Sequence, residues 1–558
     1  MPHCLFKAGF RQKLLATLIV ASLLSSVVEA QTAQRSTYTA GTVSYGHFVM
    51  NTDVGNDRFV YFEDVNGDGF TDVIVTGYTP TDRPSPGPQP GQILLNNGDN
   101  TFRAATGDRP LNEWAREILV ADFNNDGIQD IFIADHGWDA PPYPGFRNQL
   151  LLGTGQGFTD ATDRLPGLSD FSHNAAVGDV NGDGFVDILV TNTPQGNAAR
   201  APYLLMNRGN AQFDLDRTRL PESFVRADFT SEFSWAVELA DLDKDGHVDM
   251  IVGRKQGLTT LPSRIYWNPG NGEFSNAQVT HLPDMRRFVS GDKYEIIEIQ
   301  AFDVNQNGRL DLIMTAYNSN FRGTGIQLLS NLGNRQFVDS TDVCLSGITQ
   351  DPDNARNTPF HLRNVDVNFD GVSDVVAIFN NDPSEQTTLF FEGSGARLRA
   401  LTRASLGGDA EARLRLLWGQ PLVGKDVFGY AEVFVLVDNG QRKLGLNYVP
   451  VTSTPAPSVA NRFDVCSNQM RSFVDAGELG RIQLDFQLLR MEPTVQIQVL
   501  PETIKNLSVL PSRFSTFSPA TGILQVPELV VDDTIEYRGL RFQLIDGDRL
   551  IFELIGSE

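Results

Sequence analysis

Residues 64–72 read Asp-Val-Asn-Gly-Asp-Gly-Phe-Thr-Asp, which places oxygen-bearing side chains at positions 1, 3, 5 and 9 and a glycine at position 6. Alternate oxygens that converge on one centre suit a hard cation such as Ca²⁺, which takes about six to eight oxygen ligands. The glycine permits the sharp turn that brings the position 7 carbonyl and the position 9 carboxylate back toward the ion. A single copy could be an ordinary polar turn, so the rest of the chain decides.

The same nonapeptide pattern occurs six times along the chain at nearly constant spacing. Successive copies start 58, 57, 62, 62 and 63 residues apart. The copies begin at Asp64, Asp122, Asp179, Asp241, Asp303 and Asp366. A fixed internal period of about 60 residues is typical of a repeat architecture, in which each repeat is one supersecondary unit.

The nonapeptide has two other possible interpretations. An EF-hand loop looks alike over its first six positions, but it needs a glutamate at position 12 and a helix on each side. Position 12 is apolar in every copy: Val75, Ile133, Val190, Val252, Met314 and Ala377. This excludes the EF-hand. A hairpin turn without metal is disfavoured because position 9 is aspartate in all six copies.

Short apolar runs around each copy predict β-strands. Val73–Thr76 follows the first copy, and Ile93–Asn96 comes after a polar loop and leads into a turn with Gly98 before Phe102. Such runs are rich in β-branched residues, too short for helices and flanked by turn residues. Each repeat therefore predicts four strands, which is the content of one propeller blade.

The loop-and-strand stretches DVNGDGFTDVIVT at 64–76 and DVNGDGFVDILVTN at 179–192, with the LLLNxGxGxF-type strands, resemble FG-GAP/VCBS repeats. These repeats are the blades of the integrin-α-like β-propeller. The resemblance covers roughly residues 45–400 and is specific because two sub-motifs recur in register. It implies an all-β, seven-bladed propeller with six metal-binding blades.

The seventh blade has to come from outside the six motifs. Arg413–Val451 offers strands without a metal motif and predicts a degenerate blade. Tyr38–Val49 is expected to add its last strand and close the ring, which removes exposed sheet edges. We therefore expect a propeller over 36–451, a linker rich in Thr, Pro, Ser and Ala at 452–461, and a small β-sandwich-like domain at 462–558.

The first 30 residues predict a signal peptide. Basic residues precede the apolar run Leu14–Val28, and small residues suit cleavage before Gln31. The mature chain is then expected to be exported, as a secreted, periplasmic or cell-surface protein with no transmembrane segment after cleavage. Only Cys344 and Cys466 remain, and because they fall in different predicted domains, buried thiols are favoured over a bridge.

The motif predicts up to six structural Ca²⁺ ions as the cofactor, each held by side chains at positions 1, 3, 5 and 9 and the carbonyl of position 7. The predicted metal ligands are Asp64, Asn66, Asp68, Phe70 and Asp72; Asp122, Asn124, Asp126, Ile128 and Asp130; Asp179, Asn181, Asp183, Phe185 and Asp187; Asp241, Asp243, Asp245, His247 and Asp249; Asp303, Asn305, Asn307, Arg309 and Asp311; Asp366, Asn368, Asp370, Val372 and Asp374. If carboxylate count decides affinity, the fourth copy binds most tightly and the fifth is the weakest.

The composition agrees with this demand for metal. The formal net charge is −24, and six divalent ions would offset half of it, so metal is expected to contribute to folding. The same acidity argues against a nucleic-acid partner. A protein or polysaccharide at the cell surface is the expected partner.

The end of the propeller opposite the metal loops is the predicted ligand face, since aromatic and cationic residues fall there. The candidates are Arg58, Tyr78, Arg116, His136, Trp138, His173, Trp235, Arg254, Lys255 and Tyr317. They could hold a polypeptide or an anionic glycan, or Trp235 and Tyr317 could be core residues.

The resemblance implies a binding or adhesion role, and no catalytic residue is assigned. The chain has no HExxH pair, G-x-S-x-G nucleophile, P-loop lysine or dinucleotide glycine fingerprint. The alternative is a carbohydrate-active enzyme, because some exported polysaccharide lyases are similar propellers. Tyr78, Arg116, His136 and His173 are the candidates for that chemistry, on fold analogy alone.

Overall fold

The computed structural model describes most of the chain between residues 37 and 556. The described ranges are 37–41, 44–48, 58–79, 81–82, 84–99, 101–192, 201–225, 235–254, 262–285, 294–304, 308–318, 325–346, 358–369, 373–380, 388–393, 398–408, 420–425, 427–438, 441–454, 463–464, 469–475, 481–490, 496–499, 507–508, 515–518, 523–531, 535–546 and 551–556. The predicted signal peptide lies outside them. No helix within these ranges is long and apolar enough to cross a membrane.

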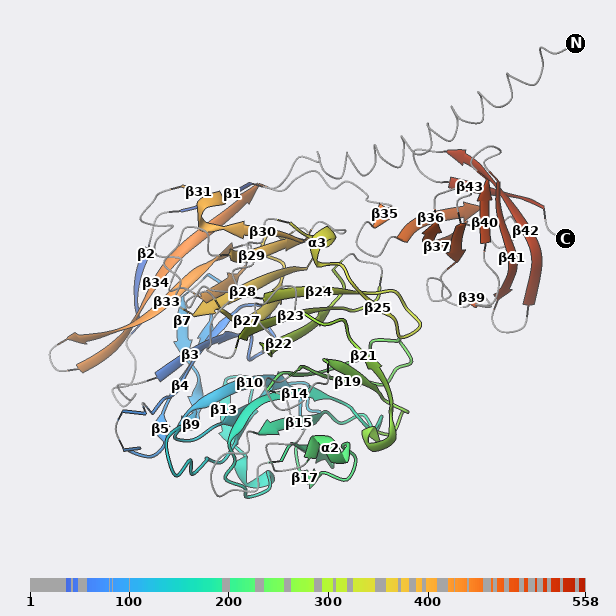
Figure 1. Cartoon of the computed structure of the whole chain (residues 1–558). Helices are drawn as coiled ribbons and strands as arrows, with labels where there is room; N and C mark the ends of the chain where they lie inside the picture. The colour runs from blue at the N-terminus through green and yellow to red at the C-terminus, as the bar shows by residue number, and fades with distance from the viewer. Residues whose placement is uncertain are drawn as a thin grey trace, which may run out of the picture.

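Seven small antiparallel sheets, which we call blades 1 to 7, form a seven-bladed propeller (Figure 1). Blade 1 contains β3 (Arg58–Glu63), β4 (Asp72–Gly77), β6 (Gln92–Asn96) and β7 (Phe102–Ala104). Blade 2 contains β10 (Ala115–Ala121), β11 (Asp130–Asp135), β12 (Gln149–Gly153) and β13 (Gly157–Asp160), with β8 (Thr106–Gly107) beside β13. Blade 3 contains β14 (Ser172–Gly178), β15 (Asp187–Asn192), β16 (Tyr203–Asn207) and β17 (Phe213–Asp216).

Blades 4 to 6 repeat the same order of strands. Blade 4 contains β18 (Val237–Ala240), β19 (Asp249–Val252), β20 (Arg264–Trp267) and β21 (Gln278–His281). Blade 5 contains β22 (Tyr294–Phe302), β23 (Asp311–Asn318), β24 (Gly325–Asn331) and β25 (Phe337–Asp339). Blade 6 contains β27 (Thr358–Val365), β28 (Asp374–Asn380), β29 (Thr388–Gly393) and β30 (Leu398–Thr402), with β26 (Leu345–Ser346) beside β30.

Short elements join the blades. They are the two-stranded pair β5 (Gln89–Pro90) and β9 (Leu111–Asn112), the single turns of helix α2 (Glu222–Val225) and α3 (Thr341–Cys344), and the 3-10 turns η1 (Thr162–Arg164), η2 (Phe274–Asn276) and η3 (Arg403–Ser405).

The ring closes through the two ends of the propeller sequence, as predicted. Blade 7 contains β32 (Gln420–Gly424), β33 (Val427–Asp438) and β34 (Gln441–Thr454), to which β1 (Thr37–Ala40) and β2 (Ser44–Phe48) add in antiparallel pairing, and β31 (Gly407–Gly408) lies beside β1. The ring of Tyr38 packs edge-on against Phe390 at 4.9 Å between centroids. Its hydroxyl donates to Glu392 Oε1 at 2.9 Å, so the N-terminal strand is anchored on blade 6 as well.

The first strand of each blade lies innermost. β3, β10, β14, β18, β22 and β27 contact one another in that order, and β32 contacts β3 and β28. The second strands are buried on both faces; β4, β11, β15 and β19 are buried at every residue. A blade sandwiched between two neighbours needs apolar residues on both faces, which explains the unbroken apolar runs in the sequence.

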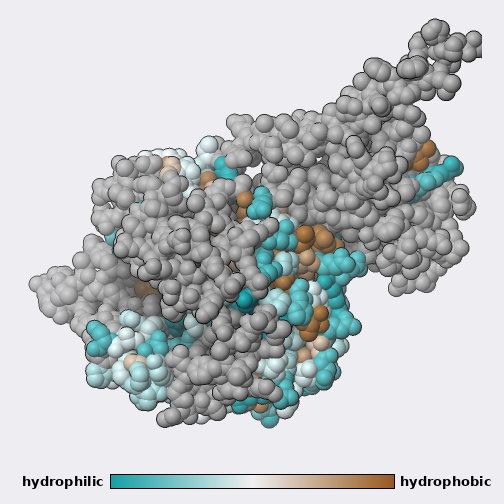
Figure 2. Space-filling model, in the orientation of Figure 1, coloured by the Kyte–Doolittle hydropathy of each residue, from teal (hydrophilic) through white to brown (hydrophobic). Residues whose placement is uncertain are grey.

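The hydrophobic core is divided among the interfaces between blades. Separate buried clusters join blades 1 and 2, 2 and 3, 3 and 4, 4 and 5, 5 and 6, 6 and 7, and 7 and 1. Hydrophobic residues reach the visible surface as small separate patches among hydrophilic ones (Figure 2). Stability therefore depends on how neighbouring blades are held together, and the loops at the blade ends contribute to that.

Two expectations for the C-terminal part of the chain need correction. The strands there form one nine-stranded sheet, β35 (Phe463–Asp464), β36 (Gln469–Asp475), β37 (Arg481–Arg490), β38 (Gln496–Val499), β39 (Leu507–Ser508), β40 (Ser515–Ser518), β41 (Ile523–Val531), β42 (Ile535–Asp546) and β43 (Ile551–Gly556). Since β43 returns to pair with β36, the sheet closes on itself instead of forming a two-sheet sandwich. Cys344, favoured as a free thiol, is buried and disulfide-bonded, and the other cysteines lie outside the described residues.

Candidate functional site

The six nonapeptide loops join the first and second strands of blades 1 to 6, so they lie at one end of the propeller. In the five loops whose position 6 glycine the structure describes, its N–H donates to a carboxylate oxygen of position 1. In loop 1, for example, Gly69 N lies 2.8 Å from Asp64 Oδ2. The same bond occurs at Gly127, Gly184, Gly246 and Gly308. These glycines have φ between 81° and 89°, which explains why the sequence requires glycine there.

In blades 1 to 4 and 6 the position 9 aspartate is a buried staple, because both of its carboxylate oxygens accept from backbone N–H groups. In blade 3, Asp187 Oδ2 accepts from Val180 N at 3.1 Å and Oδ1 accepts from Asn207 N at 2.7 Å, so one carboxylate ties the loop to the third strand. Burial raises the pKa of Asp187 to about 7, against the lowering effect of these hydrogen bonds. The equivalent Asp72, Asp130 and Asp249 behave alike. A bound cation would keep such buried carboxylates ionised.

The donor set of loop 4 fits a hard cation. Asp241, Asp243 and Asp249 each bring a carboxylate oxygen within 4.8 Å of the others. Asp241 Oδ1 is buried and has no hydrogen-bond partner among the described residues, as expected for an oxygen directed at an ion. Bound calcium would supply the positive charge that holds these oxygens together. Asn305, Asn307, Asp370 and Val372 lie outside the described residues.

Position 7, expected to supply its carbonyl, has a second role through its side chain. A Cβ added to Gly98 would meet the ring of Phe70 at 2.8 Å, and Phe185 and His247 lie in the same way against Gly209 and Gly270. Each of these side chains therefore covers the hairpin between the third and fourth strands of its own blade. Arg309, its equivalent in blade 5, is buried, and its Nε donates to Asn331 O at 3.0 Å.

A recurrent asparagine that was not assigned from sequence links neighbouring blades. Asn207 Nδ2 donates to Phe123 O of the preceding blade's loop at 2.8 Å and to Val186 O of its own loop at 3.0 Å. Asn268 in blade 4 and Asn331 in blade 5 make the same two kinds of bond, one to the preceding blade's loop and one to their own. The signal was present, since each asparagine precedes a glycine by two residues at the end of the third strand. The metal loops are thus part of the interfaces between blades.

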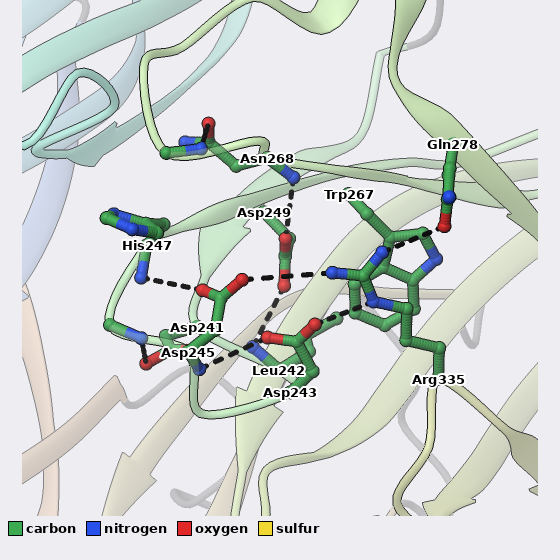
Figure 3. Close-up of polar contacts among 12 residues, drawn as sticks. Asp241, Leu242, Asp243, Asp245, His247, Asp249, Trp267, Asn268, Gln278 and Arg335 are labelled. Carbon is green, nitrogen blue, oxygen red and sulfur yellow. Dashed lines mark hydrogen bonds and ion pairs between the residues drawn. The ribbon is translucent and has the colours of Figure 1, made fainter.

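A positively charged side chain from the next blade, Arg335, reaches loop 4 (Figure 3). Arg335 follows β24 of blade 5, and its Nε lies 2.7 Å from Asp243 Oδ2 and its Nη2 3.8 Å from Asp245 Oδ2. Nη1 donates to Gln278 Oε1 at 3.0 Å, and the guanidinium lies 4.8 Å from the centroid of the Trp267 ring.

The opposite end of the propeller carries an array of rings, which we call the aromatic arc. In order, its members are Tyr78, Trp114, His136, His173, Trp235 and Tyr317. The distances between the centroids of successive rings in this order are 4.7 Å, 5.4 Å, 4.6 Å, 4.9 Å and 6.3 Å. It spans blades 1 to 5, and Phe171 packs 3.5 Å from His136. The sequence had indicated every member except Trp114, whose position just before the first strand of blade 2 matches that of Trp235 in blade 4.

The arc mixes buried and accessible rings. His136 and Tyr317 are buried, whereas Tyr78, Trp114, His173 and Trp235 are partly exposed. Tyr317 therefore belongs to the core, as the alternative interpretation held, whereas Trp235, which it also placed in the core, is partly exposed.

Other candidates from the sequence lie beside the arc or apart from it. Arg116 lies 5.9 Å from the Trp114 ring centroid, and Trp138 is partly exposed after β11. Arg254 is buried, pairs with Asp284 at 3.5 Å and lies over Tyr294, so it holds blades 4 and 5 together. Lys255 and the side chain of Arg58 lie outside what the structure describes.

Asp135 fixes the backbone that carries the arc. It is fully buried at the end of β11 and accepts from the backbone N–H groups of Glu113, Trp114 and Gly137 at 2.8–2.9 Å. Burial raises its pKa to about 6 although these bonds favour the ionised form. The backbone on both sides of His136 is therefore rigidly placed.

Glutamates on the innermost strands predict a measurable pH effect. Burial, then the charges of Glu298 and Glu117, raise the pKa of Glu238 to about 8 from its ordinary value of 4.5. Because the folded chain holds this proton more tightly, the associated stability is fully present below pH 4.5 and is lost as the pH rises through 8. In saturating calcium, Glu238→Gln should melt higher than wild type at about pH 9 and equally at about pH 4. Thermal melts across this range check it; parallel curves would contradict it.

Comparisons with known proteins agree with the repeat structure. Residues 64–133, 122–190 and 241–314 match the model of the FG-GAP-like repeat. The chain is 30% identical to human integrin alpha-IIb over 160 residues, which are 27% of this chain and 15% of that protein. The matched region thus spans a small part of the curated relative.

Two solved structures are distant likenesses. The biofilm matrix protein Bap1 of V. cholerae has a TM-score of 0.26 at 12% identity, covering 94% of this chain and 83% of that one. The GH43_1 enzyme of Xanthomonas citri, complexed with xylotriose, has a TM-score of 0.25 at 12% identity, covering 57% of this chain and 96% of that one.

Proposed function

This chain is an FG-GAP repeat protein with an integrin-α-like propeller, and from that premise we propose that it is an exported, calcium-stabilised binding or adhesion module. Its calcium ions pin the blade loops, and its ligand is a protein or glycan at or outside the cell surface. The disulfide at Cys344 supports an oxidising compartment outside the cytosol.

The observation that carries the binding role is the aromatic arc. Its partly exposed rings come from four different blades, so only the folded propeller presents them together. Tyrosine and tryptophan provide a large rigid contact area at low entropic cost, with a polar atom at the edge. Arg116 and Asp139 supply opposite charges nearby, and burial raises the pKa of Asp139. This combination suits recognition more than scaffolding.

Trp235→Ala is expected to weaken binding through the arc by about tenfold or more, because central aromatic residues dominate binding energy. Wild type and variant are compared on a glycan array and in pull-downs from cell-surface extracts. Val338→Ala is the matched control, since Val338 is 40% exposed on β25, the outermost strand of blade 5. Equal loss in both variants, or full retention in Trp235→Ala, would contradict a ligand site at the arc.

A carbohydrate-active enzyme is the second candidate, and one observation favours it. The residues considered for lyase chemistry come together in the arc, with the rings of His136 and His173 4.6 Å apart. His136 is buried and its Nδ1 lies 3.1 Å from Gly137 O, so His173 is the more accessible base. Incubation with uronate polysaccharides, followed by absorbance of unsaturated products, tests lyase activity. Activity that is lost in His173→Ala would support it, and the absence of product would exclude lyase chemistry on these uronates.

A further inference from the structure

Loop 4 has one more carboxylate than loops 1 to 3, and the extra one is Asp243 at position 3. The equivalent residues Asn66, Asn124 and Asn181 are neutral amides. Charge count alone made this the tightest of the six predicted calcium sites. The structure adds a positive charge from outside the loop, because Arg335 lies against the extra carboxylate.

The equivalent positions in blades 3 and 4 carry small uncharged residues where blade 5 carries Arg335. The residue four places after the interblade asparagine abuts the preceding blade's metal loop in each case. It is Ala211 facing loop 2, where its N–H donates to Phe123 O at 3.1 Å. It is Gly272 facing loop 3, where an added Cβ would meet Val180 O at 3.0 Å. Facing loop 4 it is Arg335, so the charged residue stands opposite the charged loop position.

Arg335 is held firmly in this place. Its Nε–Asp243 contact of 2.7 Å is a charge-assisted hydrogen bond, and Gln278 and the Trp267 ring fix the rest of the guanidinium. The Asp243 side chain is only 11% exposed, so screening by solvent is limited. The four ligand carboxylates and the guanidinium together carry the same charge as the three ligand carboxylates in each of loops 1 to 3. Lys244 of loop 4 is exposed, and its ammonium lies toward loop 5, where it would be 3.0 Å from a Cβ added to Gly308.

We propose that Arg335 sets the calcium affinity of the fourth site: it cancels the charge of Asp243, lowers the affinity to the level of sites 1 to 3, and stabilises loop 4 without metal. The inference rests on the proposed calcium binding. Asp243 Oδ2 faces the arginine and Oδ1 accepts from Asp245 N at 3.2 Å, so both oxygens of this side chain are occupied within the protein.

Four full-length proteins test the proposal: wild type, Arg335→Gln, Asp243→Asn and the double variant. Terbium luminescence sensitised by Trp267, which lies beside this loop, reports binding at the fourth site, and calcium competition gives its affinity. Arg335→Gln should bind about tenfold more tightly than wild type, since removal of one nearby positive charge favours the ion. The double variant should match wild type because its net charge is the same, and Asp243→Asn should bind about tenfold more weakly.

Two controls separate the possible failures. Arg208→Gln removes the same charge from the corresponding hairpin of blade 3, where Arg208 pairs with Asp214 of its own blade, and it should leave the affinity unchanged. Melting in chelator should fall for Arg335→Gln and not for Arg208→Gln. If wild type binds neither terbium nor calcium, the proposed calcium function fails. If it binds and Arg335→Gln is unchanged or weaker, the role of Arg335 is overturned.

Discussion

Removal of calcium with a chelator is expected to lower the melting temperature of the full chain more than any single substitution. Each ion that binds only the folded state stabilises it by about 2.7 kcal/mol at a hundredfold excess over its Kd. Sites of extracellular type have Kd values on the order of 10⁻⁴ to 10⁻³ M, so about 10 to 100 mM calcium gives that hundredfold excess.

The physical reason lies in the loops and in the interfaces they join. Without metal, the carboxylates of each loop repel one another. Burial also raises the pKa of position 9 aspartates such as Asp187 to about 7, so their ionised form is disfavoured. Because Asn207 binds a carbonyl of the preceding blade's loop, a loosened loop also weakens the neighbouring interface. Scanning calorimetry with calcium, magnesium or chelator measures the effect. A melting curve that is indifferent to chelator would refute structural calcium.

Asp187→Ala is expected to destabilise the propeller by about 2–6 kcal/mol even in the presence of chelator. The substitution leaves the buried N–H groups of Val180 and Asn207 without their acceptor, at a cost of about 1–3 kcal/mol each. The staple thus acts independently of metal, although the same carboxylate is a predicted ligand. Asp187→Asn keeps one acceptor oxygen and should cost less.

Asp183→Ala in the same loop is the matched control. Asp183 is exposed, and its side chain accepts only from its own loop, at Phe185 N and Asn181 Nδ2. The Asp183→Ala substitution should therefore remove the calcium-dependent part of the stability and leave the stability in chelator almost unchanged. Urea denaturation of both variants, with and without calcium, separates the two roles. Equal losses in chelator would show that position 9 is no different from an ordinary ligand.

Local sequence determined the blade. The nonapeptide, its glycine at position 6 and the apolar runs beside it specify a loop between two buried strands, because turn geometry and burial act over a few residues. Repetition of this unit then predicted the ring, and the need to cover sheet edges predicted its closure by β1 and β2. These inferences depend on contacts between residues that are near in sequence or recur at a fixed period.

Tertiary structure decided the contacts that do not recur from repeat to repeat. Arg335 meets Asp243 from 92 residues away, and the aromatic arc brings Tyr78 beside Trp114 and His173 beside Trp235 from separate blades. No local rule specifies which side chain crosses an interface, since that depends on how two folded blades pack. The nonapeptide at Asp64–Asp72 and its five repeats thus determined the scaffold. The arginine charge beside a metal loop and the surface that a ligand would contact exist only once the ring is closed.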